Sequence, residues 1–310
     1  MICITGPTAT GKTRLSVMLA KALDGEIISC DSMQLYRGMD VGTAKVTAQE
    51  MQGVRHHMID VIDPTDAYSV GLFVEAAGPI AEDIIARGKT AILAGGTGLY
   101  MDALVLGRSF APYPTTGKRE MLEALAEREG IEAVQDMLRE VDPEAAERLH
   151  PGDRRRIIRA MEIYLETGQT MTEHDRQSKL IPPRWQPVWI ALNYVKRQDL
   201  YTRIDKRVDE MIAAGLEAEI DALIAMGVPP EATSLQAIGY KELLAFRRGE
   251  LSREEAIDRI KQLSRNYAKR QLTWLRKNPA LHWIGLPEEP SADAVFAEAM
   301  DILREAGFPF

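Results

Sequence analysis

The chain has 310 residues, of which 45% are hydrophobic, and its formal net charge is −8. This length allows one large or two modest domains, and no apolar run reaches the roughly eighteen residues of a membrane-spanning helix, so we expect no membrane contact. The acidic balance argues against a protein coated in nucleic acid, so such a partner would have to meet a local basic surface.

Two features predict a cytoplasmic location. The only cysteines, Cys3 and Cys30, each lie in an apolar strand pattern, which is typical of buried thiols in a reducing compartment. The first functional motif begins at residue 6, which leaves no room for a signal peptide.

The first elements are a strand, a glycine-rich loop and a helix. Residues 1–5 predict a buried strand, and residues 14–23 have apolar side chains at helical spacing. Between them, residues 6–13 read GPTATGKT and fit the P-loop pattern. Glycines let N–H groups approach phosphate oxygens, the lysine supplies charge, and the last hydroxyl suits Mg²⁺. The predicted phosphate ligands are Gly6, Pro7, Thr8, Ala9, Thr10, Gly11, Lys12 and Thr13, with Thr13 also as the metal ligand.

Two further predicted strands end in polar or glycine-rich segments that should lie beside the P-loop. Residues 26–30 predict a strand that ends at Asp31, and residues 90–94 predict a buried strand that runs into a second glycine-rich loop, GGTGLY, at 95–100. A helix over 70–86 precedes the latter strand. Ligands bind at the carboxyl ends of strands in an open α/β sheet, so both loops and Asp31 should meet there.

Residues 56–61 predict a third short strand that begins with paired histidines. His56 and His57 invite a metal-site interpretation, but adjacent strand residues point to opposite faces. No third ligand has a recognisable spacing, so the pattern favours a structural role.

One motif of nucleotide hydrolases is missing. Those enzymes hold Mg²⁺ with an aspartate that ends a hydrophobic strand, whereas the best such strand here, TAILAGG, ends in glycines. No glutamate beside Asp31 stands ready to activate water. This weakens the ATPase hypothesis and leaves a kinase open.

Strand patterns stop in the middle of the chain, which predicts an inserted helical domain. We expect helices at 118–129, 131–141, 143–149 and 153–166 before a strand returns at 188–192. The predicted fold is α/β, a P-loop NTPase-like parallel sheet core with an inserted helical domain and C-terminal helices. Its predicted parts are residues 1–111 (first part of the core), 112–183 (helical insertion) and 184–310 (return strand and C-terminal helices).

A long C-terminal helix is predicted over 253–276, and no acidic residue occurs from 259 to 277. Most basic helix rows are merely solvated, but in a chain of net charge −8 this one is a candidate nucleic-acid surface. Residues 153–159 of the insertion (DRRRIIR) form a second basic patch. The basic row of the helix predicted over 253–276 consists of Lys261, Arg265, Lys269 and Arg276.

Over nearly its whole length the chain resembles the tRNA dimethylallyltransferases (isopentenyltransferases). A P-loop alone fits many enzymes, whereas the full set of motifs in this order is specific to that family. The matching blocks are GPTATGKT, DSMQLYRGMDVGTAK from Asp31, His56-His57, Tyr68-Ser69, GGTGLY, DRRRIIRAME and RNYAKRQLTWLR from Arg265.

The resemblance implies transfer of the dimethylallyl group of dimethylallyl diphosphate to the exocyclic amine of the adenine 3′-adjacent to the anticodon in tRNA. The P-loop, a motif usual for ATP and other nucleotides, would instead hold the departing diphosphate with Mg²⁺ as cofactor. Asp31 would be the general base, Thr97 would contact the diphosphate near the breaking bond, and Arg203 matches an arginine that also reaches it. We expect a monomer that binds the anticodon stem-loop.

The resemblance and the basic patches also predict the tRNA contacts. The loop after Asp31 would read the edge of a flipped adenine, and basic side chains would position the phosphate backbone. Tyr240 would stack on a splayed base or, nearly as well, belong to the core. The predicted contacts are Asp31, Ser32, Met33, Gln34, Thr97, Arg119, Arg155, Arg156, Ile157, Ile158, Arg159, Gly239, Tyr240, Arg265, Lys269 and Arg270.

Two alternatives stay open at this point. A small-molecule P-loop kinase would use Asp31 to activate a hydroxyl and the insertion as a lid, but it leaves the acid-free helix unexplained. A nucleotide-gated RNA-binding module without chemistry would tolerate the loss of Asp31, whereas an enzyme would not.

Overall fold

The computed structural model of the chain describes residues 1–108 and 116–309. Among these residues, no helix is long and apolar enough to cross a membrane. The chain divides into two compact units. Unit 1 combines Met1–Val105 with Trp185–Phe310, and unit 2 is Leu106–Arg184.

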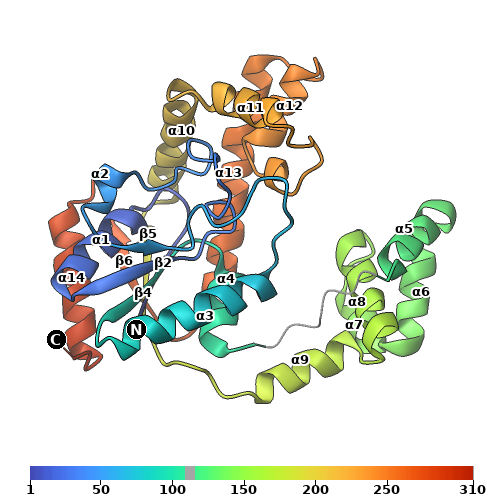
Figure 1. The fold of residues 1–310 in the computed structure, drawn as a ribbon, viewed down its shortest axis with the longest axis horizontal. Coiled ribbons are helices and arrows are strands. Elements are labelled where there is room, and N and C mark those ends of the chain that lie inside the picture. Colours follow the sequence, from blue (N-terminus) through green and yellow to red (C-terminus); the bar gives the residue numbers. More distant parts are fainter. Residues whose placement is uncertain (109–115, 310) are drawn as a thin grey trace. The chain divides into compact units, whose positions relative to one another are not determined.

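A six-stranded parallel sheet forms the centre of unit 1 and confirms the predicted α/β class (Figure 1). Its strands are apolar along most of their length because helices cover both faces of a parallel sheet and leave neither face to water. The strand order is β3-β2-β4-β1-β5-β6. The bounds are β1 Ile2–Thr5, β2 Gly25–Ser29, β3 His56–His57, β4 Thr90–Ala94, β5 Val188–Tyr194 and β6 Leu281–Leu286.

Helices complete unit 1, and several begin at side chains that satisfy free N–H groups of their first turn. Ser69 accepts the N–H of Leu72, and Ser252 forms a capping box with Glu255. The helices are α1 Lys12–Ala22, α2 Ala48–Met51, α3 Val70–Ala86, α4 Gly98–Leu106, α10 Arg197–Ala213, α11 Leu216–Ala225, a 3₁₀ turn Ser234–Gln236, α12 Tyr240–Arg247, α13 Arg253–Leu275 and α14 Ala292–Glu305.

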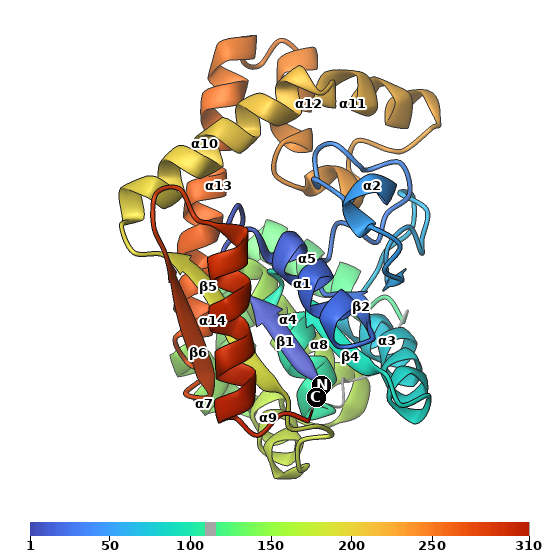
Figure 2. The same ribbon diagram turned by 90° about the vertical axis from the view of Figure 1, so that its left-hand side faces the viewer.

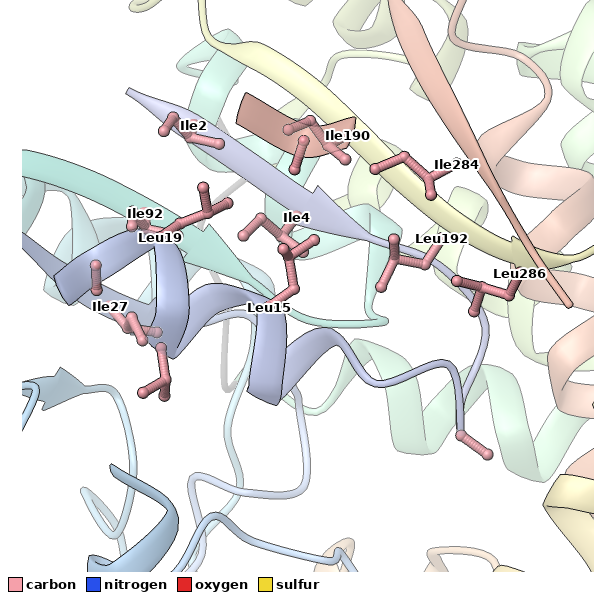
Figure 3. Packing of buried hydrophobic residues seen from close by; sticks show 14 of the residues in the cluster. Ile2, Ile4, Leu15, Leu19, Ile27, Ile92, Ile190, Leu192, Ile284 and Leu286 are labelled. Atoms are coloured by element: carbon pink, nitrogen blue, oxygen red, sulfur yellow. The ribbon is translucent and has the colours of Figure 1, made fainter. Parts of the chain in front are cut away.

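Side chains alternate between the two faces of the sheet, and each face has its own core. Ile2 and Ile4 of β1 pack on one face with Leu15 and Leu19 of α1 (Figure 3). Cys3, between those isoleucines, belongs to the cluster on the other face, beneath α3 and α4. Helix α14 lies beside α1 on the first face (Figure 2). The central strand is therefore buried on both sides.

The loop that follows β2, residues 31–45, belongs to a third core in unit 1. We call this segment the β2 loop. Its Tyr36 packs with Ile220 of α11, Tyr240 of α12 and Ile260 of α13. The β2 loop therefore packs against α11, α12 and α13.

The third predicted strand, residues 56–61, is shorter than expected. β3 contains only His56 and His57, because Met58 and Asp60 adopt positive φ angles of 61° and 54°. Left-handed residues cannot continue an extended strand, so the pairing ends there.

Unit 2 is a bundle of helices with a separate apolar core. Its centre includes Leu122, Val134 and Leu138, together with Ile157 and Ile158. The last two were predicted to contact tRNA, but their side chains are buried, so the structure contradicts that prediction for both. The helices are α5 Lys118–Glu129, α6 Ile131–Val141, α7 Pro143–Arg148, α8 Arg154–Thr167 and α9 Met171–Leu180.

The two connections to unit 2 leave unit 1 at a single point. The backbone N–H of Trp185 donates to the carbonyl oxygen of Val105 at 3.3 Å, so the outgoing and returning chains lie side by side there.

A buried carboxylate on β2 links the sheet to its surroundings. Glu26 accepts hydrogen bonds from Arg87 at 2.6 and 2.9 Å and lies 2.8 Å from His57 Nε2. The hydrogen bond from Arg87, more than the contact with His57, lowers the pKa of Glu26 to about 2.

This ion pair should make stability sensitive to acid. The folded pKa of Glu26 lies below its unfolded value, so its contribution is present at neutral pH and is lost as the pH falls from about 5 towards about 2. Between pH 7 and pH 3, Glu26 should account for a loss of about 2 kcal/mol in the free energy of unfolding. Denaturant titrations at both pH values should show a smaller drop in Glu26→Gln and an unaltered drop in Glu298→Gln, whose carboxylate is exposed. Equal drops in all three proteins would contradict this role.

Candidate active site

The P-loop joins β1 to α1 and presents the start of that helix at the carboxyl edge of the sheet. Gly6 has a φ of 141°, and a Cβ there would lie 2.4 Å from the carbonyl oxygen of Leu192 on β5. Gly11 precedes α1 with a φ of 81° and offers no side-chain cap. The N–H groups of the first helical turn are thus left for an anion, as the sequence motif predicts.

Lys12 lies over this loop, where its Nζ donates to the carbonyl oxygen of Pro7 at 2.8 Å. Burial lowers the pKa of Lys12 to about 7, the cation of Arg207 acts in the same direction, and the carboxylate of Asp31 opposes both. A bound phosphate would restore the charged form of the lysine. The loop therefore has a cation whose charge depends on its ligand.

Asp31 and Thr97 lie together, as predicted. The N–H of Ser32, next to Asp31, donates to Thr97 Oγ1 at 3.2 Å, and the N–H of Thr97 donates back to the carbonyl oxygen of Cys30 at 3.2 Å. Asp31 Oδ1 accepts the N–H of Met33 at 2.9 Å, which fixes the carboxylate in a turn. The end of β2 and the loop after β4 are thereby joined.

One buried side chain of α13 joins the P-loop to the second glycine-rich loop. Gln271 Oε1 accepts the N–H of Thr8 at 3.0 Å, and its Nε2 donates to the carbonyl oxygen of Gly96 at 2.8 Å. The hydroxyl of Tyr267, one turn earlier, lies within hydrogen-bond reach of the side chains of Gln271 and Thr97. Burial raises the pKa of Tyr267 to about 12, and the nearby Asp31 charge adds to that effect. The P-loop and the loop after β4 are therefore both fastened to α13, and the start of the β2 loop is joined to them through Thr97.

The same helix explains two glycines of the GGTGLY motif. A Cβ on Gly96 would lie 2.3 Å from Nε2 of Gln271, and a Cβ on Gly98 would lie 2.4 Å from the ring of Trp274. Trp274 is itself held by a 2.8 Å hydrogen bond to Asp102. These positions need glycine because α13 occupies the space of any side chain.

Arg207 of α10 is a site residue that the sequence analysis missed. Burial lowers its pKa, Asp31 acts against that shift, and its Nε has no hydrogen-bond partner among the described residues. Arg203, the arginine predicted to reach the diphosphate, pairs instead with Glu210 at 3.2 Å. The helical period of the sequence could have identified Arg207 as the more buried of the two arginines. Arg207 lies nearer than Arg203 to the buried face of α10.

Two predicted tRNA contacts have other partners in this structure. Gln34 Oε1 accepts from Ser29 at 3.1 Å, and its Nε2 donates to the carbonyl oxygens of Thr43 and Ala44, so its amide holds the β2 loop. Tyr240 is fully buried, which contradicts stacking on a base and favours the core alternative.

The acid-free segment of α13 receives its counter-charges from another helix. Lys261 pairs with Asp209 of α10 at 2.7 Å, and Arg265 pairs with Asp205. Lys269 and Arg270 are exposed and have no ion pair among the described residues. Their side chains lie over the rings of Tyr201 and Tyr267 instead. Only part of the predicted basic row is thus available to a polyanion.

In unit 2, too, some of the arginines predicted to contact tRNA form ion pairs and another does not. The buried carboxylate of Glu162 forms ion pairs with both Arg119, at 3.3 Å, and Arg159, at 2.9 Å. Arg156 lies 3.5 Å from Asp153, whereas Arg155 is exposed and has no ion pair among the residues described. Contacts of these four arginines with tRNA stay predictions.

Oxygen donors for a metal ion are sparse at the site. Thr13 is exposed at the start of α1, and the described residues contain no cluster of three His, Cys, Asp or Glu side chains able to hold a metal. His56 Nδ1 lies 2.9 Å from the carbonyl oxygen of Val54, and His57 contacts Glu26. A Mg²⁺ ion here would take most of its ligands from phosphate oxygens and water.

A cavity of about 1180 Å³ lies at the opposite end of the sheet. Its lining includes Met1, Thr90 and Val188, at the amino ends of three strands, and none of Lys12, Asp31, Thr97 or Arg207. The chemistry-bearing side chains meet at the carboxyl edge, which we take as the candidate active site.

Comparisons with known proteins agree with the motifs. The family model described as IPP transferase matches residues 34–278, and that described as isopentenyl transferase matches residues 1–66. A tRNA dimethylallyltransferase of Caldanaerobacter subterraneus is 46% identical over 285 residues, which cover 91% of this chain and 90% of that protein. A tRNA isopentenylpyrophosphate transferase structure from Bacillus halodurans has a TM-score of 0.72 at 42% identity and covers 98% of this chain and 96% of that one. A eukaryotic dimethylallyltransferase structure has a TM-score of 0.82 at 30% identity and covers 98% and 79%, respectively.

Replacing Gln271 by alanine should loosen the loops that it joins. The N–H of Thr8 and the carbonyl oxygen of Gly96 would lose their partner, so inorganic pyrophosphate, a probe of the P-loop, should bind about 10-fold more weakly. Calorimetric titration measures this, with Gln262→Ala, an exposed glutamine on the same helix, as the control. Wild-type affinity in Gln271→Ala would show that the amide does not support the P-loop.

Proposed function

Because this chain belongs to the IPP transferase family, we propose that its sheet-edge site transfers the dimethylallyl group of dimethylallyl diphosphate to the exocyclic amine of the adenine 3′-adjacent to the anticodon in tRNA. The observation that carries the proposal is the meeting of three parts at one edge: Gln271 of α13 joins the P-loop to the loop that contains Thr97, and Thr97 accepts the N–H next to Asp31. Family membership decides for prenyl transfer over the kinase alternative, and it identifies the chain as an enzyme.

The diphosphate would occupy the P-loop. Free N–H groups at the start of α1 suit its oxygens, and Lys12 gains charge as an anion approaches. Arg207 has a buried Nε that finds no hydrogen-bond partner in the described part of the chain, and an anion would satisfy it. We therefore assign to Arg207 the diphosphate contact that the sequence suggested for Arg203.

Asp31 would serve as the general base. The amine nitrogen attacks the first carbon of the allylic chain, the carbon–oxygen bond breaks with its electron pair passing to the diphosphate, and the amine proton passes to Asp31. The N–H of Met33 holds the carboxylate of Asp31 in place, and Thr97, joined to the same turn, would contact the diphosphate near the breaking bond. Charge that develops on the leaving group would be stabilised by Lys12 and Arg207.

Magnesium fits this donor set as an ion carried largely by the substrate. The Thr13 hydroxyl would hold it beside the diphosphate oxygens. When bound, Mg²⁺ would neutralise charge on the leaving diphosphate.

For tRNA, the exposed Lys269 and Arg270 of α13 and Arg155 of unit 2 are the cations that we propose for phosphate contacts. Such contacts add affinity and orientation without reading sequence. We further propose that the anticodon stem-loop is the bound region, that the chain acts as a monomer, and that it works in the cytoplasm.

Asp31→Asn should abolish prenyl transfer while leaving pyrophosphate affinity within about 2-fold, because the amide keeps the side-chain shape but accepts no proton. Prenyl transfer is measured by the incorporation of label from dimethylallyl diphosphate into unmodified tRNA, and pyrophosphate affinity is measured by calorimetry. Asp24→Asn, which alters an exposed carboxylate paired with Lys89, is the matched control. Near-normal turnover in Asp31→Asn would remove Asp31 as the base.

The two arginines of α10 can be distinguished by the same assay. Arg207→Gln should raise KM for dimethylallyl diphosphate by about 10- to 100-fold, because it removes a half-buried cation, with its buried Nε donor, from the leaving-group site. Arg203→Gln, which loses only a half-exposed pair with Glu210, should change KM by less than about 3-fold. The reverse ranking would restore the sequence-based assignment.

A further inference from the structure

One carboxylate from outside the β2 loop accepts several of its backbone N–H groups. Glu219 of α11 accepts three successive backbone N–H groups, from Asp40 at 2.7 Å, Val41 at 2.6 Å and Gly42 at 3.1 Å. Consecutive N–H groups that converge in this way form an anion-binding nest, and here the anion is a side chain of the same molecule. Charge-assisted hydrogen bonds of this kind are among the strongest that a loop can make.

Tyr240 completes the arrangement. Its hydroxyl donates to Glu219 Oε1 at 2.6 Å, and its ring fills the space that a Cβ on Gly42 would need, with contacts of 2.5 to 2.6 Å. Burial, and after it the charge of Glu219, raise the pKa of Tyr240, so the hydroxyl stays protonated as a donor. Tyr240 thus holds the carboxylate while its ring supports the loop backbone.

The clamped segment is coupled to the catalytic edge through Gln34. Its amide donates to the carbonyl oxygens of Thr43 and Ala44, directly after the nest, and lies three residues beyond Asp31. Lys45 adds a further contact, since its buried Nζ donates to the carbonyl oxygen of Tyr36 at 2.9 Å. A shift of residues 40–42 would therefore be passed to Asp31 and its neighbours through the loop's own hydrogen bonds.

We propose that Glu219 and Tyr240 are positioning residues that hold the β2 loop in the conformation that places Asp31, Ser32 and Met33 against the target adenine. Neither residue touches the reacting atoms, and their effect is exerted through residues 40–44. The inference rests on the proposed function, because it assigns the β2 loop to the nucleobase side of the site and the P-loop to the diphosphate side.

The test separates the two sides kinetically. Glu219→Gln replaces one acceptor oxygen by a donor that opposes the loop N–H groups, and kcat/KM for tRNA should fall by about 10- to 100-fold. Tyr240→Phe keeps the ring against Gly42 and loses only the hydroxyl, so the fall should be about 3- to 10-fold. KM for dimethylallyl diphosphate should stay within about 2-fold in both variants, because the P-loop is held by Gln271 instead.

The matched control is Glu217→Gln on the same helix, whose carboxylate pairs with Arg253 at 2.7 Å and makes no contact with the β2 loop among the described residues. Its kinetics should equal those of the wild type. If Glu219→Gln fails to fold, which its thermal unfolding would show, Tyr240→Phe carries the test alone.

Amide hydrogen exchange at residues 40–42 provides a readout that needs no activity. Exchange there should accelerate in Glu219→Gln and Tyr240→Phe but not in Glu217→Gln. Unchanged exchange would overturn the clamp, and faster exchange with unaltered tRNA kinetics would overturn its role in positioning. A wild-type protein that transfers no prenyl group would refute the proposed function, while the exchange experiment would still report on the clamp.

Discussion

The amide of Gln271 is the contact on which the organisation of the site depends. It bridges loops that leave different strands, and it does so with one acceptor for the N–H of Thr8 and one donor for the carbonyl oxygen of Gly96. A carboxylate or an ammonium group of similar size could satisfy only one of these partners. The close approach of α13 in turn excludes side chains at two positions of the GGTG loop. One helix therefore sets both the spacing of the loops and part of their sequence.

The basic side chains differ in how fully nearby acids compensate their charge. Many of the basic side chains are neutralised by acids from neighbouring elements, as Lys261 and Arg265 are by α10. At the carboxyl edge the balance differs, because burial lowers the pKa of both Lys12 and Arg207, and the charge of Asp31 opposes each shift without cancelling it. Partial burial of cations without full compensation is unfavourable, so a bound anion would stabilise this edge. The diphosphate that we propose for this site would therefore gain part of its binding energy by relieving the repulsion between these cations.

The sequence predicts the elements that depend on local patterns and misses contacts that depend on tertiary packing. The buried strands and the P-loop follow from apolar runs and glycine spacing, so their positions agree with the structure. The hydrophobic pattern predicts a third strand that is too long, because it contains no signal for the left-handed backbone of Met58 and Asp60. The acid-free stretch of α13 looked like an open basic surface because its partners, Asp205 and Asp209, lie far away in the sequence. Tyr240 likewise could be placed in the core only once Glu219 and the β2 loop were seen around it.

The hydrogen bond between Trp185 and Val105 gives the helical insertion the topology of a module. Both of its ends meet unit 1 at one point, so the parallel sheet closes its hydrogen-bond ladders without any residue from unit 2. A gene segment encoding such a module can be lengthened, exchanged or acquired late without disturbing the register of any strand. Unit 1, with its continuous sheet, and unit 2, with its separate core, can therefore change in sequence at different rates.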